Sequence, residues 1–344
     1  MGRLIHGLAA AGSLRVLAAD TTDITEEARQ RHGLSATATA ALGRAMTGGL
    51  LLAFLLSKTP RERVDLRFDG DGPLGGLIVD AGPDGTVRAY AKNPRAELPL
   101  RRDGKLNVGA LVGKGQLRVS RALSNGEIYD SATELVSGEI AEDLAHYLWQ
   151  SEQVPSAVLL GVRVHGDGRV QVAGGVIVQV MPEASQAVID ALEANLRRLG
   201  GITPLLAEHG MERTVEILLK GLDYTRTDLR ALGFEGNYIP LQFRCTCSQQ
   251  KAREALIFFD RGEREEMITK DGGAEAVCHW CNQRYWITPE EIRSLAEPST
   301  GGEVRCPDCG TLWYFQTAAG LEVHHDGETC TCGRRVRRDE GPRA

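Results

Sequence analysis

The cysteines constrain this chain more than any other feature of its sequence. All eight lie after residue 244, and they stand in four close pairs: Cys245/Cys247, Cys278/Cys281, Cys306/Cys309 and Cys330/Cys332. In the reducing cytoplasm, closely spaced cysteines indicate metal binding or redox chemistry rather than a permanent disulfide framework. The first 244 residues must therefore fold around an apolar core without thiol ligands, whereas the C-terminal part can use them.

The central motif is Cys245-Thr-Cys247, followed after thirty residues by Cys278-His-Trp-Cys281. Four thiolates suit the tetrahedral geometry of Zn²⁺, and the Cys-x-x-Cys half is a common zinc knuckle. We therefore expect these cysteines to bind one zinc ion, with His279 at the surface; the alternative is a group of buried free thiols. Cys278 and Cys281 also have the spacing of a thioredoxin-type pair, but no βαβ pattern surrounds them.

Zinc held by thiolates can act as a redox switch, because thiolates are the species that oxidants attack. A disulfide between Cys245 and Cys247 would close a very small, strained ring, which should make it readily reversible. A structural zinc contributes about 10–16 kcal/mol to the folding of a small domain, whereas whole domains have about 5–15 kcal/mol of net stability. Oxidation that removes zinc should therefore unfold this module and weaken whatever packs on it.

The bulk composition is that of a globular protein. The length of 344 residues suits two or three domains, and 42% hydrophobic with 25% charged residues is ordinary for a soluble chain. The net charge of −6 argues against a general nucleic-acid binder. The uncharged run 45–57 is shorter than the ~20 residues that span a membrane. His6 and Arg15 interrupt a weak signal-like start, so we expect a first strand there and a cytoplasmic protein.

The chain is expected to be of mixed α+β class, and residues 1–182 should form its N-terminal α/β domain. Apolar runs of strand length occur at residues 14–17, 64–68, 77–79, 87–90, 117–119, 157–164 and 170–180. Turn sequences at 82–85 and 165–168 predict hairpins, so the sheets should be largely antiparallel. Helices are expected from a Ser35 cap to about Leu56 and from about Glu139 to Trp149.

Residues 183–232 predict a helical linker. Leu192 and Leu196 belong to a helical apolar stripe with Val188 and Leu199 that ends at Gly200-Gly201, and shorter helices should follow at about 203–210 and 212–219. Short helices are marginal in water unless they pack on a neighbour, so the linker should be metastable. The candidates for client contact are apolar residues that ordinary packing would explain equally well: Leu192, Leu196, Ile217 and Leu218.

Residues 233–297 should form the redox-switch zinc domain, and residues 298–344 an additional zinc-ribbon-like extension. A capping box at 288–291 begins a helix that runs to about Ala296. Cys306-Pro-Asp-Cys309 and Cys330-Thr-Cys332 repeat the first set in reverse order and predict a second zinc site, which could be structural or a second redox sensor. His324 and His325 could substitute as ligands, but we expect them in a solvated loop. The basic run 334–338 is expected to be a solvated tail, although it could contact RNA.

One further motif is discounted. The segment from Gly70 to Gly75 matches the spacing of the dinucleotide-binding fingerprint, but Pro73 interrupts it and a strand follows where a helix is required. We therefore expect a turn between strands. No Walker loop and no Gly-x-Ser-x-Gly elbow is present in the sequence.

From about residue 10 to residue 292, the chain resembles the heat-shock protein 33 family, the redox-regulated holdase chaperones also called 33 kDa chaperonins. The matching segments are 70–75, 151–161, 173–182, 238–247 and 271–281, which read GDGPLG, SEQVPSAVLLG, AGGVIVQVMP, YIPLQFRCTC and DGGAEAVCHWC. The family usually ends near residue 297, so the extension with the second cysteine set departs from its pattern and puts a stoichiometry of one zinc in question.

The resemblance implies that the protein is a redox-regulated chaperone and not an enzyme. The reduced, zinc-bound protein would be inactive. Oxidative stress, usually with heat, would form the disulfides Cys245–Cys247 and Cys278–Cys281, release zinc and unfold the zinc module and the linker. The protein would then dimerise and bind unfolding client proteins without ATP. Two other functions stay open: a nucleic-acid-binding zinc ribbon in the extension, and a thiol-disulfide oxidoreductase.

Overall fold

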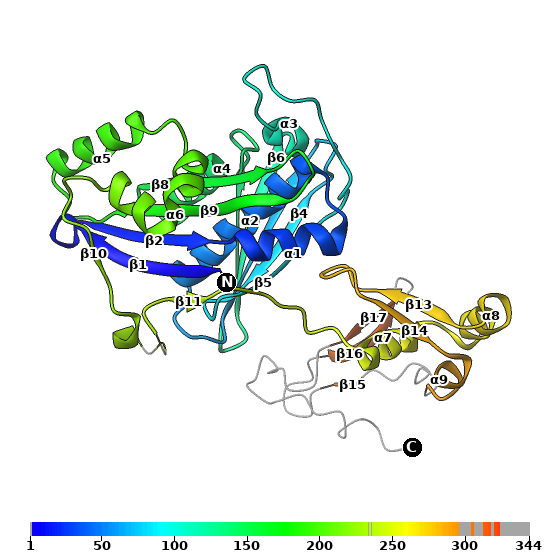
Figure 1. Ribbon diagram of the computed structural model, residues 1–344. Helices are drawn as coiled ribbons and strands as arrows, with labels where there is room; N and C mark the ends of the chain where they lie inside the picture. The colour runs from blue at the N-terminus through cyan, green and yellow to red at the C-terminus, as the bar shows by residue number, and fades with distance from the viewer. Residues whose placement is uncertain are drawn as a thin grey trace. The chain divides into compact units, whose positions relative to one another are not determined.

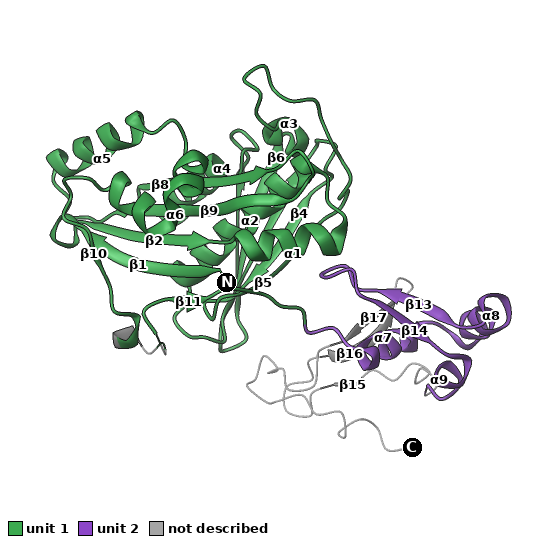
Figure 2. Cartoon of the chain, in the orientation of Figure 1, with its two compact units in different colours: residues 1–245 green, residues 246–344 purple. Residues whose placement is uncertain are grey.

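A computed structural model describes residues 2–232, 234 and 236–295, together with the backbone of three short antiparallel strands: β15 (Val304–Arg305), β16 (Leu312–Thr317) and β17 (Gly320–Val323) (Figure 1). The chain has two compact units, Met1–Cys245 and Thr246–Ala344 (Figure 2). The predicted α+β class with largely antiparallel sheets is confirmed.

The first unit contains two six-stranded sheets. One has the order β10 (Thr225–Arg226), β1 (Arg3–Ala9), β2 (Leu14–Asp20), β9 (Val170–Val180) and β8 (Ser156–Val164), with β11 (Ile239–Pro240) also pairing with β1. All of its pairs are antiparallel. The N-terminus is therefore a strand, as predicted, and the turn at 165–168 joins β8 to β9 as a hairpin.

The second sheet has the order β12 (Gln242–Phe243), β5 (Thr86–Ala91), β4 (Leu77–Ala81), β3 (Arg63–Gly70), β6 (Gly115–Ala122) and β7 (Ile128–Glu134). Its pairs are antiparallel except the one between β12 and β5, which is parallel. The segment from Gly70 to Gly75 lies in the connection between β3 and β4, and no helix follows it. The predicted turn is thus confirmed at this position.

Helix α2 (Ala36–Leu56) is the central helix of this unit and contacts strands of both sheets (Figure 1). It begins as predicted, because Ser35 Oγ accepts a hydrogen bond of 3.1 Å from the amide of Ala38. Within the described residues, α2 is the one helix that is long and apolar enough, by length and composition, to cross a membrane. However, 78% of its most apolar 18-residue window is buried inside the fold, as in the core helix of a globular protein.

Helices α5 (Gln186–Arg198) and α6 (Ile202–Leu218) pack their apolar sides against strands of the first sheet in one core. Leu192 is buried in this core, and Val188, Leu196 and Leu199 pack against it, so the predicted stripe is confirmed. Gly210 has a non-helical backbone (φ 72°, ψ 175°) inside α6, which marks the predicted division into two helical segments. Because α2 and α6 both contact β9, its apolar run is buried along nearly its whole length.

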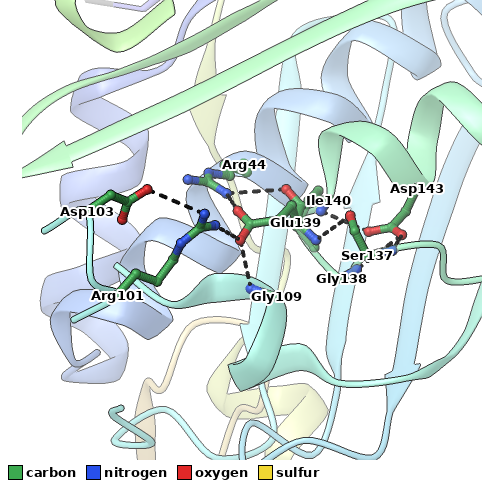
Figure 3. Close-up of polar contacts among 9 residues, drawn as sticks. All are labelled: Arg44, Arg101, Asp103, Gly109, Ser137, Gly138, Glu139, Ile140 and Asp143. Carbon is green, nitrogen blue, oxygen red and sulfur yellow. Dashed lines mark hydrogen bonds and ion pairs between the residues drawn. The ribbon is translucent and has the colours of Figure 1, made fainter. Parts of the chain in front are cut away.

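The remaining helices of the first unit are α1 (Thr22–His32), α3 (Val108–Val112) and α4 (Ala141–Gln150), with short 3₁₀ turns at Ala10–Gly12 and Leu229–Leu232. Asp143 is fully buried and organises the start of α4 (Figure 3). Its Oδ1 accepts from the amides of Val136, Ser137 and Gly138 at 2.8–3.2 Å, and its Oδ2 accepts from the amide of Ile140 at 2.9 Å. These bonds hold Ile140 at φ 71°, a conformation that a β-branched residue rarely adopts.

The described part of the second unit contains α7 (Gln249–Ala255), a 3₁₀ turn (Leu256–Phe258), α8 (Arg261–Asp271), the hairpin β13 (Ala274–Val277) and β14 (Arg284–Ile287), and α9 (Pro289–Arg293). The predicted capping box of α9 is present, since Thr288 Oγ1 accepts from the amide of Glu291 and the Glu291 carboxylate accepts from the amide of Thr288. The core is small, with four buried aliphatic residues: Leu256, Ile268, Ile287 and Ile292.

Candidate metal centre

The structure brings the four predicted cysteines together. The Sγ atoms of Cys245, Cys247, Cys278 and Cys281 all lie within 4.8 Å of one another, and those of Cys247 and Cys281 are 3.3 Å apart. Sulfurs around a tetrahedral zinc with Zn–S bonds of about 2.3 Å would be about 3.8 Å apart. Cys281 is buried and the other three are half-buried. These four side chains could therefore hold one metal ion, and their soft sulfur donors favour zinc.

Cys245 is placed by a strap, residues 239–244, that pairs with both sheets of the first unit. Its first strand, β11, pairs with β1, and its second, β12, pairs with β5. The amide of Arg244 donates to Val87 O at 2.8 Å, which extends the pairing to the residue before Cys245. Phe243 is buried, with the Arg31 guanidinium 5.5 Å from its ring centre. The position of this thiol thus depends on the N-terminal sheets.

Cys278 and Cys281 are placed by the tight turn between β13 and β14. The amide of Cys278 donates to Gln283 O at 2.9 Å, and the amide of Asn282 donates to Cys278 O at 2.7 Å. Asn282 adopts a left-handed backbone (φ 58°), which asparagine tolerates better than most residues. This turn points both sulfurs of the Cys-x-x-Cys motif to one side. His279 is exposed, as expected.

Two polar residues beside the sulfurs were not identified from the sequence. The phenol of Tyr285 lies 3.0 Å from the Sγ of Cys247, and this hydrogen bond, with burial and the neighbouring sulfurs, raises the pKa of Tyr285 to about 12. In the first unit, Arg88 on β5 donates to Cys245 and also to the buried Asp80, at 2.6 and 2.8 Å. Burial opposes the charge of Arg88, but these two acceptors outweigh it and hold its pKa above the usual value.

These two residues had no local signal in the sequence. Tyr285 lies on a strand, and the alternation of side chains along a strand does not by itself say which face of the hairpin its ring occupies. Arg88 is more than 150 residues from Cys245 in the sequence. Only the strand pairings bring them to the sulfurs. The second cysteine set, Cys306, Cys309, Cys330 and Cys332, lies outside the described residues, as do His324, His325 and the basic run 334–338.

Comparison with known proteins gives consistent matches. The sequence pattern of the family described as Hsp33 protein matches residues 2–288. A 33 kDa chaperonin of Thermus thermophilus is 66% identical over 336 residues, covering 98% of this chain and 97% of that protein. A 33 kDa chaperonin of Deinococcus radiodurans is 45% identical over 305 residues, covering 88% of this chain and 99% of that protein.

The Thermus match takes in nearly the whole chain, so the C-terminal extension has a counterpart in that relative. Among solved structures, the 33 kDa chaperonin (heat shock protein 33 homolog) of Thermotoga maritima has a TM-score of 0.76 and 36% identity, covering 85% of this chain and 96% of that one. The names of these relatives describe a chaperone and not an enzyme. The chain, with its four clustered cysteines, belongs to the heat-shock protein 33 family.

Proposed function

We propose that this chaperone is an oxidation-activated holdase of the cytoplasm. In its reduced form it is inactive and binds one zinc ion through Cys245, Cys247, Cys278 and Cys281. In its oxidised form it binds unfolding or oxidatively damaged proteins without ATP and prevents their aggregation. The observation that carries the proposal is the approach of four sulfurs to within 4.8 Å of one another.

Zinc, when bound, keeps the four thiols as thiolates and joins two separate segments of the chain. Oxidation removes these ligands in two steps, Cys245 with Cys247 and Cys278 with Cys281. In each step two thiolates lose two electrons to one molecule of hydrogen peroxide, which also takes up two protons from the solvent, and the products are one disulfide and two molecules of water. The Sγ distances do not select this pairing, because all four sulfurs are mutually close; it comes from the family resemblance.

The balance of free energies explains why oxidation would unfold the zinc domain. The described part of its core has four buried aliphatic side chains, which contribute roughly 6–12 kcal/mol before the entropy of ordering the chain is subtracted. A structural zinc contributes about 10–16 kcal/mol. Zinc thus contributes at least as much as the described core, and because folding must also offset the entropy of ordering the chain, a domain without its thiolate ligands is expected to lose its fold.

We place the chaperone domain at residues 1–182, the linker at 183–232, the switch at 233–297 and the zinc-ribbon extension at 298–344. The apolar side of the linker is the candidate client surface, because unfolding of α5 and α6 would expose Leu192 and Leu218, which are 3% and 1% exposed in the folded protein. Leu196 and Ile217 lie on the same helices. The oxidised protein acts as a homodimer in this proposal.

The deciding experiment measures zinc per chain before and after treatment with peroxide at raised temperature, together with a mass-spectrometric disulfide map and light scattering of a heat-unfolded client. We expect two zinc ions per reduced chain, one in the switch and one in the extension at Cys306, Cys309, Cys330 and Cys332. Oxidation should release the zinc of the switch, form disulfides at Cys245–Cys247 and Cys278–Cys281 and suppress aggregation. One ion left after oxidation would mean a structural ribbon beside the switch, whereas none would mean that the second cysteine set is also redox-active. If oxidation neither releases zinc nor suppresses aggregation, the proposal is wrong.

Two further measurements test the rival functions. Salt-dependent binding of RNA or DNA by the full chain, lost on neutralising the arginines of 334–338, would favour a nucleic-acid-binding ribbon. Catalytic turnover of a disulfide substrate with the zinc domain still folded would favour an oxidoreductase. A stoichiometric response that accompanies unfolding supports the holdase instead.

A further inference from the structure

The first unit contains a cleft of about 570 Å³ that the proposed switch does not use. Its wall brings together distant segments: Arg44 of α2, the loop with Arg101 and Lys105, Glu139 before α4, Arg163 of β8, and the turn into α6 at residues 200–204. A volume of this size is typical of small-molecule sites. The chemistry of the wall therefore indicates what the cleft could bind.

Positive charge dominates the wall. Four cationic side chains line it (Arg44, Arg101, Lys105 and Arg163) against two carboxylates (Glu139 and Glu142), an excess of two positive charges in a chain whose net charge is −6. Neither Lys105 nor Arg163 forms an ion pair with another described residue. A positively charged cleft in a protein whose net charge is negative favours an anionic ligand.

Glu139 is a carboxylate shared by the two other cations, and Asp103 is a second partner of Arg101 at 3.4 Å (Figure 3). Glu139 accepts from Arg44 at 2.6 Å, from Arg101 at 3.2 Å and from the amide of Gly109 at 3.2 Å. The Nε of Arg44 is buried and has no hydrogen-bond partner among the described residues. Glu139 therefore positions both guanidinium groups, with Asp103 beside Arg101. The accessible guanidinium N–H groups that these carboxylates do not use can donate to a ligand.

The start of α6 adds amide donors to the same wall. Its N-cap is Gly201, which provides no side chain to accept from the first-turn amides, and residues 200–204 line the cleft. The amide end of the first helical segment of α6, residues 202–209 before the break at Gly210, therefore lies at the same space as the four cationic side chains. Its first-turn donors are the amides of Ile202, Thr203 and Leu205, because Pro204 has no N–H. Amides at a helix start together with arginine side chains are a combination that suits phosphate oxygens.

We propose that this cleft is a binding site for a phosphate-bearing anion that contacts both the N-terminal core and the start of α6. Arg163 and Lys105 supply charge that has no ion-pair partner among the described residues, Arg44 and Arg101 supply directed donors, and α6 supplies backbone amides. The start of α6 sits directly on β8, where a Cβ at Gly161 would lie 2.6 Å from Thr203 Oγ1. A bound anion would thus join the linker to the core and stabilise the folded linker.

A consequence for regulation rests on the proposed function. If unfolding of the linker activates the chaperone, a ligand that binds the folded linker opposes activation. The binding of the anion does not depend on activation by unfolding. If the holdase proposal fails, the binding test therefore keeps its meaning, and if no anion binds, the holdase proposal still stands.

The test is isothermal titration calorimetry of pyrophosphate into the reduced, zinc-loaded full chain at low salt. The variant K105Q/R163Q removes two charges from the cleft, and K114Q/R118Q removes two exposed charges elsewhere in the same unit as a matched control. We expect saturable binding that K105Q/R163Q weakens at least about tenfold and that the control changes by less than about twofold. Absence of saturable binding up to about 10 mM, or equal weakening in both variants, would overturn the proposal.

Two more arms locate the ligand and identify its source. Hydrogen exchange should slow in the first turn of α6, at the amides of Ile202, Thr203 and Leu205, when pyrophosphate is added. Protection confined to other parts of the chain would contradict the site. ATP that binds more tightly than pyrophosphate would point to a nucleotide, whereas equal binding would point to an inorganic phosphate compound. Both of these outcomes support a phosphate site.

Discussion

The phenol oxygen of Tyr285 lies 3.0 Å from the Sγ of Cys247, so one of the four clustered sulfurs accepts a hydrogen bond from a side chain of the same hairpin that carries Cys278 and Cys281. A hydrogen bond donated to a sulfur ligand lowers the electron density on the sulfur and fixes the direction in which the sulfur points. The hairpin therefore provides two sulfurs and also orients a third, which comes from a different part of the chain.

The variant Tyr285→Phe removes this hydrogen bond and keeps the ring. We expect zinc to bind about tenfold more weakly and to be released faster by peroxide, because partners of metal ligands commonly change affinity by about 10–100-fold. Zinc release is measured with a chromogenic chelator. Tyr129→Phe, at an exposed tyrosine of β7, is the control and should behave like the parent. Equal release rates in the two variants would show that Tyr285 has no such role.

Asp143→Asn tests the buried carboxylate that accepts four backbone hydrogen bonds. The asparagine amide would present N–H donors to N–H donors and leave buried groups unsatisfied, so we expect a loss of about 2–4 kcal/mol of unfolding free energy. Urea denaturation of the reduced, zinc-loaded protein measures it. Glu142→Gln changes the neighbouring exposed carboxylate and should shift stability by less than about 0.5 kcal/mol. A similar small effect for Asp143→Asn would contradict the predicted importance of this network.

Gly161→Ala tests how closely α6 sits on β8. The added Cβ would lie 2.6 Å from Thr203 Oγ1 and 2.8 Å from Ile202 Cγ2, so the start of α6 must shift. We expect about 1–3 kcal/mol of destabilisation and faster hydrogen exchange across α6. In the proposed mechanism, this variant would also be activated by oxidation at lower temperature. Gly166→Ala, where a Cβ meets nothing within 4 Å, is the control; unchanged exchange in Gly161→Ala would refute the tight contact.

The environment of Asp65 predicts that the free energy of unfolding depends on pH. Burial and the neighbouring charge of Asp80 raise the pKa of Asp65 to about 6. Because this pKa lies above its value in the unfolded chain, the folded state holds the proton more tightly. Ionisation of Asp65 therefore lowers stability progressively as the pH rises from about 4 to above 6, by up to about 3 kcal/mol.

Asp65→Asn should remove this penalty. The variant should be more stable than the parent at pH 8, and the difference should shrink toward pH 4. Urea denaturation of both proteins at several pH values measures the difference between their free energies of unfolding. Protonation of other groups contributes nearly equally to both proteins and therefore largely cancels in this difference. Asp84→Asn, at a more exposed carboxylate in the turn between β4 and β5, is the control. A difference between parent and Asp65→Asn that does not change with pH would contradict the raised pKa.

Local patterns predicted the elements whose signals are contained in a few neighbouring residues. The cap at Ser35, the capping box of Thr288 and Glu291, and the hairpin turns all appear where the sequence indicates them. Helix α1 was not predicted, because it is mainly polar and buries only Ile24, Thr25 and Ala28. Its weak apolar periodicity gives little signal, and its helical state depends on packing against α2 and β9.

The sequence alone determined that four thiols must form one site, because their types and spacings are the ligand set of a tetrahedral metal. The tertiary structure decided what surrounds that site. Arg88 reaches Cys245 only because the strap pairs with β5, and Tyr285 reaches Cys247 only because the hairpin turns its ring to that side. The basic cleft likewise exists only where distant segments meet. Such neighbours are set by strand pairing and packing over long separations in sequence, and short-range periodicity carries no information about them.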